Sequence, residues 1–153
     1  MRNASTIKRL AMSFLLRASS DWAARDREQH AIAGDAALRY AVQLQPDDAE
    51  SWTALAARTF RGESRDNEGG TDLAESMLVV AERADPQYAP AKALHAALLL
   101  EARGDISGSR KKFQEAIMLR PLDPQLHKGF AKAAEAEKDI QSARASFKTV
   151  LRQ

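Results

Sequence analysis

Three prolines at nearly regular intervals constrain the fold of this chain more than any other feature of its sequence. Pro46, Pro86 and Pro121 each follow a helical pattern of apolar residues, with separations of 40 and 35 residues. Proline lacks an amide hydrogen and clashes with the preceding helical turn, so each of these prolines is expected to end a helix. A period between about 20 and 50 residues indicates a repeat architecture. The spacing therefore predicts copies of one helical unit that end near Pro46, Pro86 and Pro121.

The residues that precede these prolines repeat a pattern of large and small side chains. An alanine stands five residues before each proline, and a large apolar residue stands three residues before each alanine. The pairs are Leu38 with Ala41, Leu78 with Ala81, and Phe113 with Ala116, and Ala143 with Phe147 indicates a further copy. Large and small residues that alternate on one helix face let neighbouring helices interlock. Together with abundant alanine and only 6% aromatic residues, the pattern predicts an all-α fold.

Turn and capping residues mark the expected helix boundaries. Asp47 with Glu50 has the spacing of a capping box, and Asp123 precedes Pro124 at an expected helix start. Gly104-Asp105 predicts a turn inside one unit, and Lys138-Asp139 occupies the equivalent place in the last unit. We therefore expect each unit to be a helical hairpin.

Two stretches resemble the tetratricopeptide repeat family. Residues 49–56 (AESWTALA) are similar to the opening helix of a repeat, and residues 104–121 are similar to its second helix. The resemblance covers residues 30–153. It implies an antiparallel helix-pair solenoid, a right-handed superhelix with about three good repeats and a degenerate N-terminal one. Residues 1–29 would then be a basic amphipathic helix and its connection, and the polar, Gly-rich stretch 61–71 a protruding loop.

The resemblance also implies a concave groove lined by the first helix of each repeat, where a peptide or helix of a partner would bind. The residues expected to face this groove are Thr53, Ala57, Phe60, Arg61, Leu94, Leu98, Glu101, Lys128, Lys132 and Glu135. Some family members hold acidic chaperone C-termini with lysines and asparagines on these helices. Thr53 and Ala57 stand at matching places here, so we expect no such clamp.

The function expected from this resemblance is a protein–protein interaction scaffold, in the narrower case a bacterial assembly or secretion accessory factor. One alternative is a tetratricopeptide subunit of bacterial cytochrome c maturation, because the insertion at 61–71 is similar. Another is a helical-repeat RNA-binding protein, because residues 103–153 carry a net charge of +5. Few aromatic residues are available for base stacking, so nucleic acid is the weaker alternative.

Catalytic and metal-binding patterns are missing from the sequence. The chain has no cysteine, no phosphate-binding glycine loop and no Gly-x-Ser-x-Gly or His-Glu-x-x-His motif. Its histidines, His30, His95 and His127, are far apart and lack metal-ligand spacing. We expect a protein that is not an enzyme and that uses no cofactor or metal.

The two ends of the chain carry further expectations. Residues 5–17 form a basic amphipathic pattern, which either caps the repeat stack or contacts an anionic membrane surface. At the other end, Phe147, Val150 and Leu151 are expected to remain partly uncovered by the rest of the chain. Either the chain continues in a longer parent protein or this end associates with a second copy. No apolar run approaches the roughly 20 residues of a membrane-spanning helix, and we expect a cytoplasmic protein.

Overall fold

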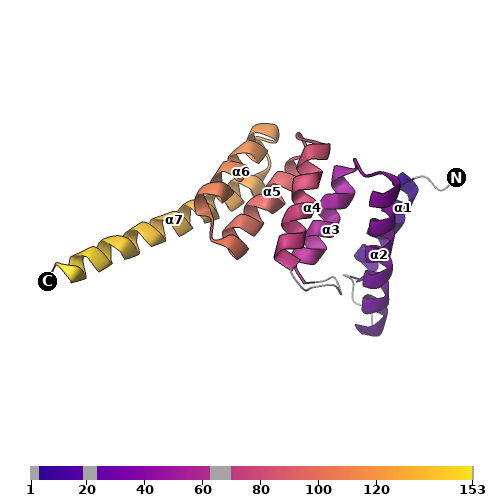
Figure 1. Cartoon of the computed structure of the whole chain (residues 1–153), viewed down its shortest axis with the longest axis horizontal. Coiled ribbons are helices and arrows are strands. Elements are labelled where there is room, and N and C mark those ends of the chain that lie inside the picture. The colour runs from indigo at the N-terminus through magenta and orange to yellow at the C-terminus, as the bar shows by residue number, and fades with distance from the viewer. Residues whose placement is uncertain (1–3, 19–23, 63–69, 153) are drawn as a thin grey trace. The chain divides into compact units, whose positions relative to one another are not determined.

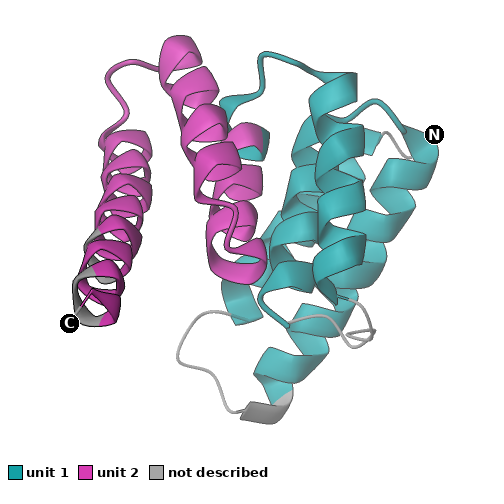
Figure 2. Ribbon diagram, turned by 60° about the vertical axis from the view of Figure 1, so that its left-hand side comes forward, with its two compact units in different colours: residues 1–91 teal, residues 92–153 magenta. Residues whose placement is uncertain are grey.

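The computed structural model describes residues 4–18, 24–62 and 70–152, and every regular element within them is helical (Figure 1). The elements are α1 (Ala4–Ala18), α2 (Ala24–Leu44), α3 (Ala49–Phe60), α4 (Gly70–Ala84), α5 (Ala89–Leu98), the π-helical turn η1 (Leu99–Arg103), α6 (Ile106–Leu119) and α7 (Pro124–Leu151). The chain divides into two compact units, unit 1 (Met1–Ala91) and unit 2 (Lys92–Gln153), which are coloured separately in Figure 2.

Unit 1 consists mainly of two packed helical hairpins. Helix α1 packs on α2 and α3 packs on α4, while α2 and α3 also contact each other. The buried core joins Ala11 of α1, Leu38 and Val42 of α2, and Leu55 of α3. Small and branched residues thus meet between the hairpins, as the alternating pattern before Pro46 predicts.

The turn around each of the three prolines has the same hydrogen bonds. The amide of the residue before the proline donates to the carbonyl of the alanine four residues earlier, at 2.9 Å, 3.0 Å and 3.0 Å for the turns at 46, 86 and 121. The carbonyl of that same residue then accepts from the amide three positions on, at 3.2 Å, 3.1 Å and 3.2 Å. These repeated bonds confirm that the prolines mark equivalent points of successive helical units.

The larger residues of the repeat pattern are buried as expected. Leu38 and Leu78 are fully buried, and Phe113 is almost so. Their alanine partners, Ala41, Ala81 and Ala116, are also buried. Burying these side chains removes apolar surface from water, which is the main stabilising term of a helical stack.

In unit 2, the part of α5 that belongs to this unit contacts α6, and α6 packs on α7. Ser109 donates from Oγ to the carbonyl of Ala96 at 2.7 Å, and Lys92 Nζ lies 3.3 Å from Glu115 Oε2. Arg110 of α6 forms an ion pair with Glu137 of α7, and its guanidinium carbon lies 5.5 Å from the ring centroid of Phe130. A hydrogen bond, two ion pairs and a cation–π contact therefore connect these three helices.

The local boundary predictions had mixed outcomes. Gly104 adopts a left-handed φ of 63°, and Asp105 accepts from the Gly108 amide at 2.9 Å, which confirms the predicted turn. Asp123 accepts from the Gln125 amide at 3.0 Å at the start of α7, which confirms that boundary. The predicted capping box at Asp47 is wrong, because the N-cap of α3 is the next residue, Asp48. The Asp48 side chain also makes no capping hydrogen bond to the backbone.

The predicted turn at Lys138-Asp139 is wrong, because α7 continues unbroken from Pro124 to Leu151. Neither position offers a glycine or a proline, and good helix formers surround them. Three helical hairpins are therefore followed by a single long helix instead of a fourth hairpin. Residue 29, where the sequence suggested a division, falls inside α2, and α1 pairs with that helix. Most of the predicted loop at 61–71 lies outside the described residues.

Candidate functional site

A shallow hollow of about 210 Å³ opens on unit 2 between η1, α6 and α7. Its apolar part is formed by Ala97, Leu100 and Phe113, and its polar part by Glu101, Gln125, Lys128 and Lys132. Gly129 of α7 also lines it. A mainly apolar hollow with a few converging polar groups is the common form of a binding site for a side chain or small ligand.

Charged groups of both signs stand at the rim of this hollow. Lys132 Nζ lies 3.1 Å from Glu101 Oε1, so α7 and η1 are joined by an ion pair there. Both side chains are at least half exposed, so the pair is worth little in stability and can exchange partners easily. Lys128, one helical turn earlier, is exposed beside the same hollow. The rim can therefore offer two ammonium groups to an anionic segment while Glu101 orients one of them.

The shape of the hollow depends on one glycine and one π-helical turn. A Cβ atom at Gly129 would come too close to the Phe113 ring, so the absence of a side chain is what lets α7 approach α6 here. The π-helical turn η1 ends at Gly104, whose amide donates to the Leu99 carbonyl. Leu100 and Glu101, two of the residues that line the hollow, belong to this turn.

Unit 2 contains six of the ten residues expected to face a groove. Three of them, Glu101, Lys128 and Lys132, meet at the hollow. Leu98 is fully buried, so it is a core residue in this structure. Leu94 is half-buried and Glu135 is exposed, and neither lines the hollow.

The other four expected residues belong to unit 1. Thr53 is buried, and its hydroxyl donates to the Ala49 carbonyl at 2.7 Å. Its polar group is therefore used in a hydrogen bond within α3. Ala57 and Phe60 are half-buried, and Arg61 is exposed directly after the end of α3. These four positions do not line the hollow of unit 2.

Sequence reasoning missed Ala97, Leu100, Phe113, Gln125 and Gly129 as lining residues. The repeat pattern predicts that Phe113 packs between helices, and in the structure it is buried and also lines the hollow. Gly129 gave a usable signal, because a glycine inside a helix indicates a close approach or a functional constraint. Leu100 gave none, since the position of η1 follows from packing and not from a local pattern.

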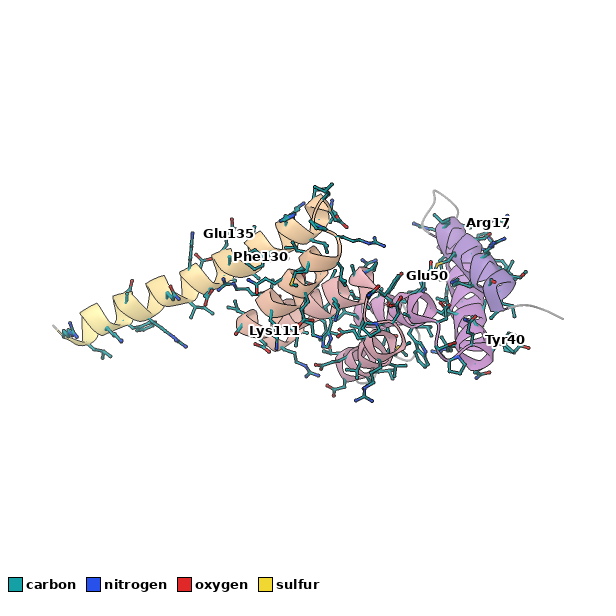
Figure 3. The ribbon with its side chains drawn as sticks, turned by 90° about the horizontal axis from the view of Figure 1, so that it is seen from above. Arg17, Tyr40, Glu50, Lys111, Phe130 and Glu135 are labelled. Carbon is teal, nitrogen blue, oxygen red and sulfur yellow. The ribbon has the colours of Figure 1, made fainter. Side chains whose placement is uncertain are left out.

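A second hollow, of about 250 Å³ in unit 1, is strongly acidic. Asp47, Asp48, Glu50 and Asp85 line it together with Gln45, Ala49 and Tyr88. Lys8 Nζ lies 2.7 Å from Glu50 Oε2 and 3.3 Å from Asp48 Oδ1, and Glu50 is labelled in Figure 3. Hydrogen bonding to Glu50 is the main reason that the pKa of Lys8 is raised, and the charge of Asp48 adds to it while burial opposes it. This lysine partly neutralises the acidic surface.

Within the described ranges, no three His, Asp or Glu side chains come together as metal ligands. None of the helices described is long and apolar enough to cross a membrane.

The basic amphipathic pattern of residues 5–17 is used inside unit 1. Ile7 and Ala11 are buried, Leu15 packs against Gly34 of α2, and Phe14 stacks on His30 with ring centroids 5.9 Å apart. This packing favours the expectation that the helix covers the repeat stack, because its apolar face is occupied. Leu10 and Leu16 stay exposed.

Comparison with known proteins shows the fold. No protein-family model and no curated protein sequence matches the chain. Among solved structures, the first tetratricopeptide domain of Spaghetti (RPAP3), bound to the HSP90 peptide SRMEEVD, matches with a TM-score of 0.65 at 14% identity, covering 86% of this chain and 98% of that domain. The chain therefore has the tetratricopeptide type of helical repeat fold.

Two further matches have the same fold. The Yersinia enterocolitica type III secretion chaperone SycD, in complex with a peptide of the translocator YopD, matches with a TM-score of 0.61 at 14% identity, over 92% of this chain and 93% of that one. The Thermobaculum terrenum O-GlcNAc transferase mutant K341M matches with a TM-score of 0.66 at 21% identity, over 87% of this chain but only 23% of the transferase.

Proposed function

We propose that this protein is a protein–protein interaction module and not an enzyme, and that it binds a short segment of a partner in the hollow of unit 2. The observation that carries the proposal is the pairing of an apolar floor, Leu100 and Phe113, with the exposed ammonium groups of Lys128 and Lys132. The fold supports it, because structures of this type include two with peptides bound.

The chemistry of the hollow selects the class of segment. An apolar side chain of the partner would cover the floor and release ordered water. A carboxylate next to it would meet Lys128, or would replace Glu101 as the partner of Lys132. We therefore propose a peptide in which an aliphatic or aromatic residue is flanked by Asp or Glu.

Peptide selection on the full-length protein tests this proposal. A random 12-residue display library is selected against the immobilised protein, and the enriched peptides are titrated by fluorescence anisotropy. Enriched peptides should share an apolar residue beside acids. Replacing Lys128 and Lys132 together by Glu should weaken their binding at least tenfold, or about 1.4 kcal/mol.

Lys111→Glu is the matched control, because Lys111 is an exposed lysine of α6 outside the hollow, labelled in Figure 3. This variant has the charge change of one hollow substitution and should bind like the wild type. Selection of peptides without acids, or equal affinity of all three proteins, would overturn the proposal.

A narrower form of the proposal places the protein as a cytoplasmic assembly or secretion accessory factor that holds the segment before its delivery. A tetratricopeptide subunit of cytochrome c maturation is the alternative within the same class. Binding of apocytochrome c segments in preference to the selected acidic peptides would favour that alternative.

RNA binding is the competing function from another class. The basic residues of unit 2 favour it, but the hollow offers only two cations, Lys128 and Lys132, beside the acidic Glu101, and Phe113 is too deeply buried for a base to stack on its face. RNA retention that falls steeply with salt would support RNA binding against our proposal.

A further inference from the structure

The C-terminal half of α7 carries an apolar stripe that the rest of unit 2 leaves uncovered. Leu126, Ala133, Ile140 and Phe147 follow one another at intervals of seven residues. The first two are 4% and 0% exposed, whereas Ile140 is 44% and Phe147 is 70% exposed. Figures 1 and 3 show the reason, because α7 continues well past the end of α6.

The stripe has the spacing of a helix–helix contact. A seven-residue interval keeps side chains on the face that a second, nearly parallel or antiparallel helix covers. Its first half is covered by α6 within unit 2. Leu151, one turn after Phe147, is 84% exposed and extends the uncovered apolar surface. Apolar side chains gathered on one face of a protruding helix indicate an interaction surface.

The net charge of the same segment selects the occupant. Residues 138–152 contain four cations, Lys138, Arg144, Lys148 and Arg152, and a single acid, Asp139. All five side chains are exposed. A second copy of α7 would bring the same excess of positive charge against this one, which is unfavourable. An acidic helix would instead gain both burial and charge complementarity.

We propose that residues 138–152, at the C-terminal end of α7, are a docking surface for an acidic amphipathic helix of a partner protein, with apolar residues at seven-residue spacing and Asp or Glu beside them. This surface is separate from the hollow, which lies against the N-terminal half of the same helix. The protein would thus have two contact surfaces, one for a short segment and one for a helix.

The direct test is a titration of full-length protein with two designed three-heptad peptides, measured by fluorescence anisotropy. Both peptides carry Leu at the core positions, and one carries Glu and the other Lys at the flanking positions. The Glu peptide should bind at least tenfold more tightly than its Lys twin. Raising the salt concentration should reduce this difference, because the exposed charges are screened.

Two variants locate the contact. Replacing Ile140 and Phe147 together by Glu should weaken binding of the Glu peptide at least tenfold, and both positions are exposed enough to accept the change without unfolding. Leu122→Glu is the control, since Leu122 is 94% exposed in the turn before α7 and lies off the stripe. Replacing Lys128 and Lys132 by Glu should leave this binding unchanged, which separates it from the proposed peptide site.

Three results would overturn the proposal. The first is equal binding of both peptides, or binding of neither. The second is a wild-type dimer in sedimentation velocity that becomes monomeric with Ile140 and Phe147 replaced, because the occupant would then be a second copy. The third is cosedimentation with phosphatidylserine vesicles that is lost with the same replacement, because the occupant would then be a membrane.

Discussion

The close approach of α7 to α6 at Gly129 makes a prediction whose sign depends on the tertiary structure. An isolated helix gains roughly 0.8–1 kcal/mol when an interior glycine becomes alanine. Here the new methyl group would meet two ring atoms of Phe113, which is almost fully buried. Overpacking of this kind costs typically 1–3 kcal/mol. We therefore expect Gly129→Ala to destabilise the protein by about 1 kcal/mol in spite of its better helix propensity.

A double-mutant cycle separates the two contributions. In the Phe113→Leu background the aromatic ring is gone, so Gly129→Ala should recover most of the propensity gain and become neutral or stabilising. The difference between the two backgrounds should be at least about 1 kcal/mol, as expected for residues in direct contact. Urea unfolding followed by far-UV circular dichroism measures all four proteins.

Ala131→Gly calibrates the propensity term, because Ala131 is exposed on the same helix. It should cost about 1 kcal/mol. If Gly129→Ala stabilised the wild type by a similar amount, or had the same effect in both backgrounds, α7 could not approach Phe113 as closely as the structure shows.

Three further predictions concern unit 1. Arg58 of α3 and Asp35 of α2 form a largely buried ion pair. Asp35→Asn should therefore lower the free energy of unfolding by about 1.5–3 kcal/mol, measured by urea titration. Asp47→Asn is the control, because Asp47 is exposed. The pKa of Lys8 is raised, so its ion pairs stabilise the folded state fully below the ordinary value of 10.5 and lose this effect as pH rises through the folded value. The stability difference between wild type and Lys8→Met should accordingly be constant near neutral pH and shrink above about pH 10.5, and a difference that persists there would refute the assignment. Thr53 is buried and Ala57 has no charge, so neither can hold a terminal carboxylate. A chaperone C-terminal peptide ending in EEVD should therefore bind with a Kd above about 1 mM, measured by fluorescence anisotropy. Tight, carboxylate-dependent binding would contradict this.

The repeat architecture was accessible from the sequence because its determinants are local. Pro46, Pro86 and Pro121 end helices through their own covalent structure, and the alanine five residues before each must be small wherever helices stack. Gly104 and Asp105 likewise act on the backbone within three residues. Such features have the same effect in any tertiary context, so the helical hairpins and their turns could be predicted.

Which residues line the hollow of unit 2 depends on packing between helices that are far apart in the sequence. Glu101, Lys128 and Lys132 could be predicted because they occupy regular positions on first helices. Leu98 and Thr53 occupy equally regular positions, but packing buries them, and helical periodicity alone does not reveal which side of a wide stripe is covered. Leu100 lines the hollow from within the π turn at 99–103, and no residue pattern marks that turn.

The last helix shows the same division most clearly. Lys138-Asp139 matches the place of a turn in the repeat, but neither residue breaks a helix, and α7 continues through this point. The chain by itself determined which residues favour helix, where three helices end, and which stripe on α7 is apolar. Only the tertiary structure decided that α6 covers Leu126 and Ala133 and ends before Ile140 and Phe147, because burial depends on the length of the neighbouring helix and not on the sequence of the stripe.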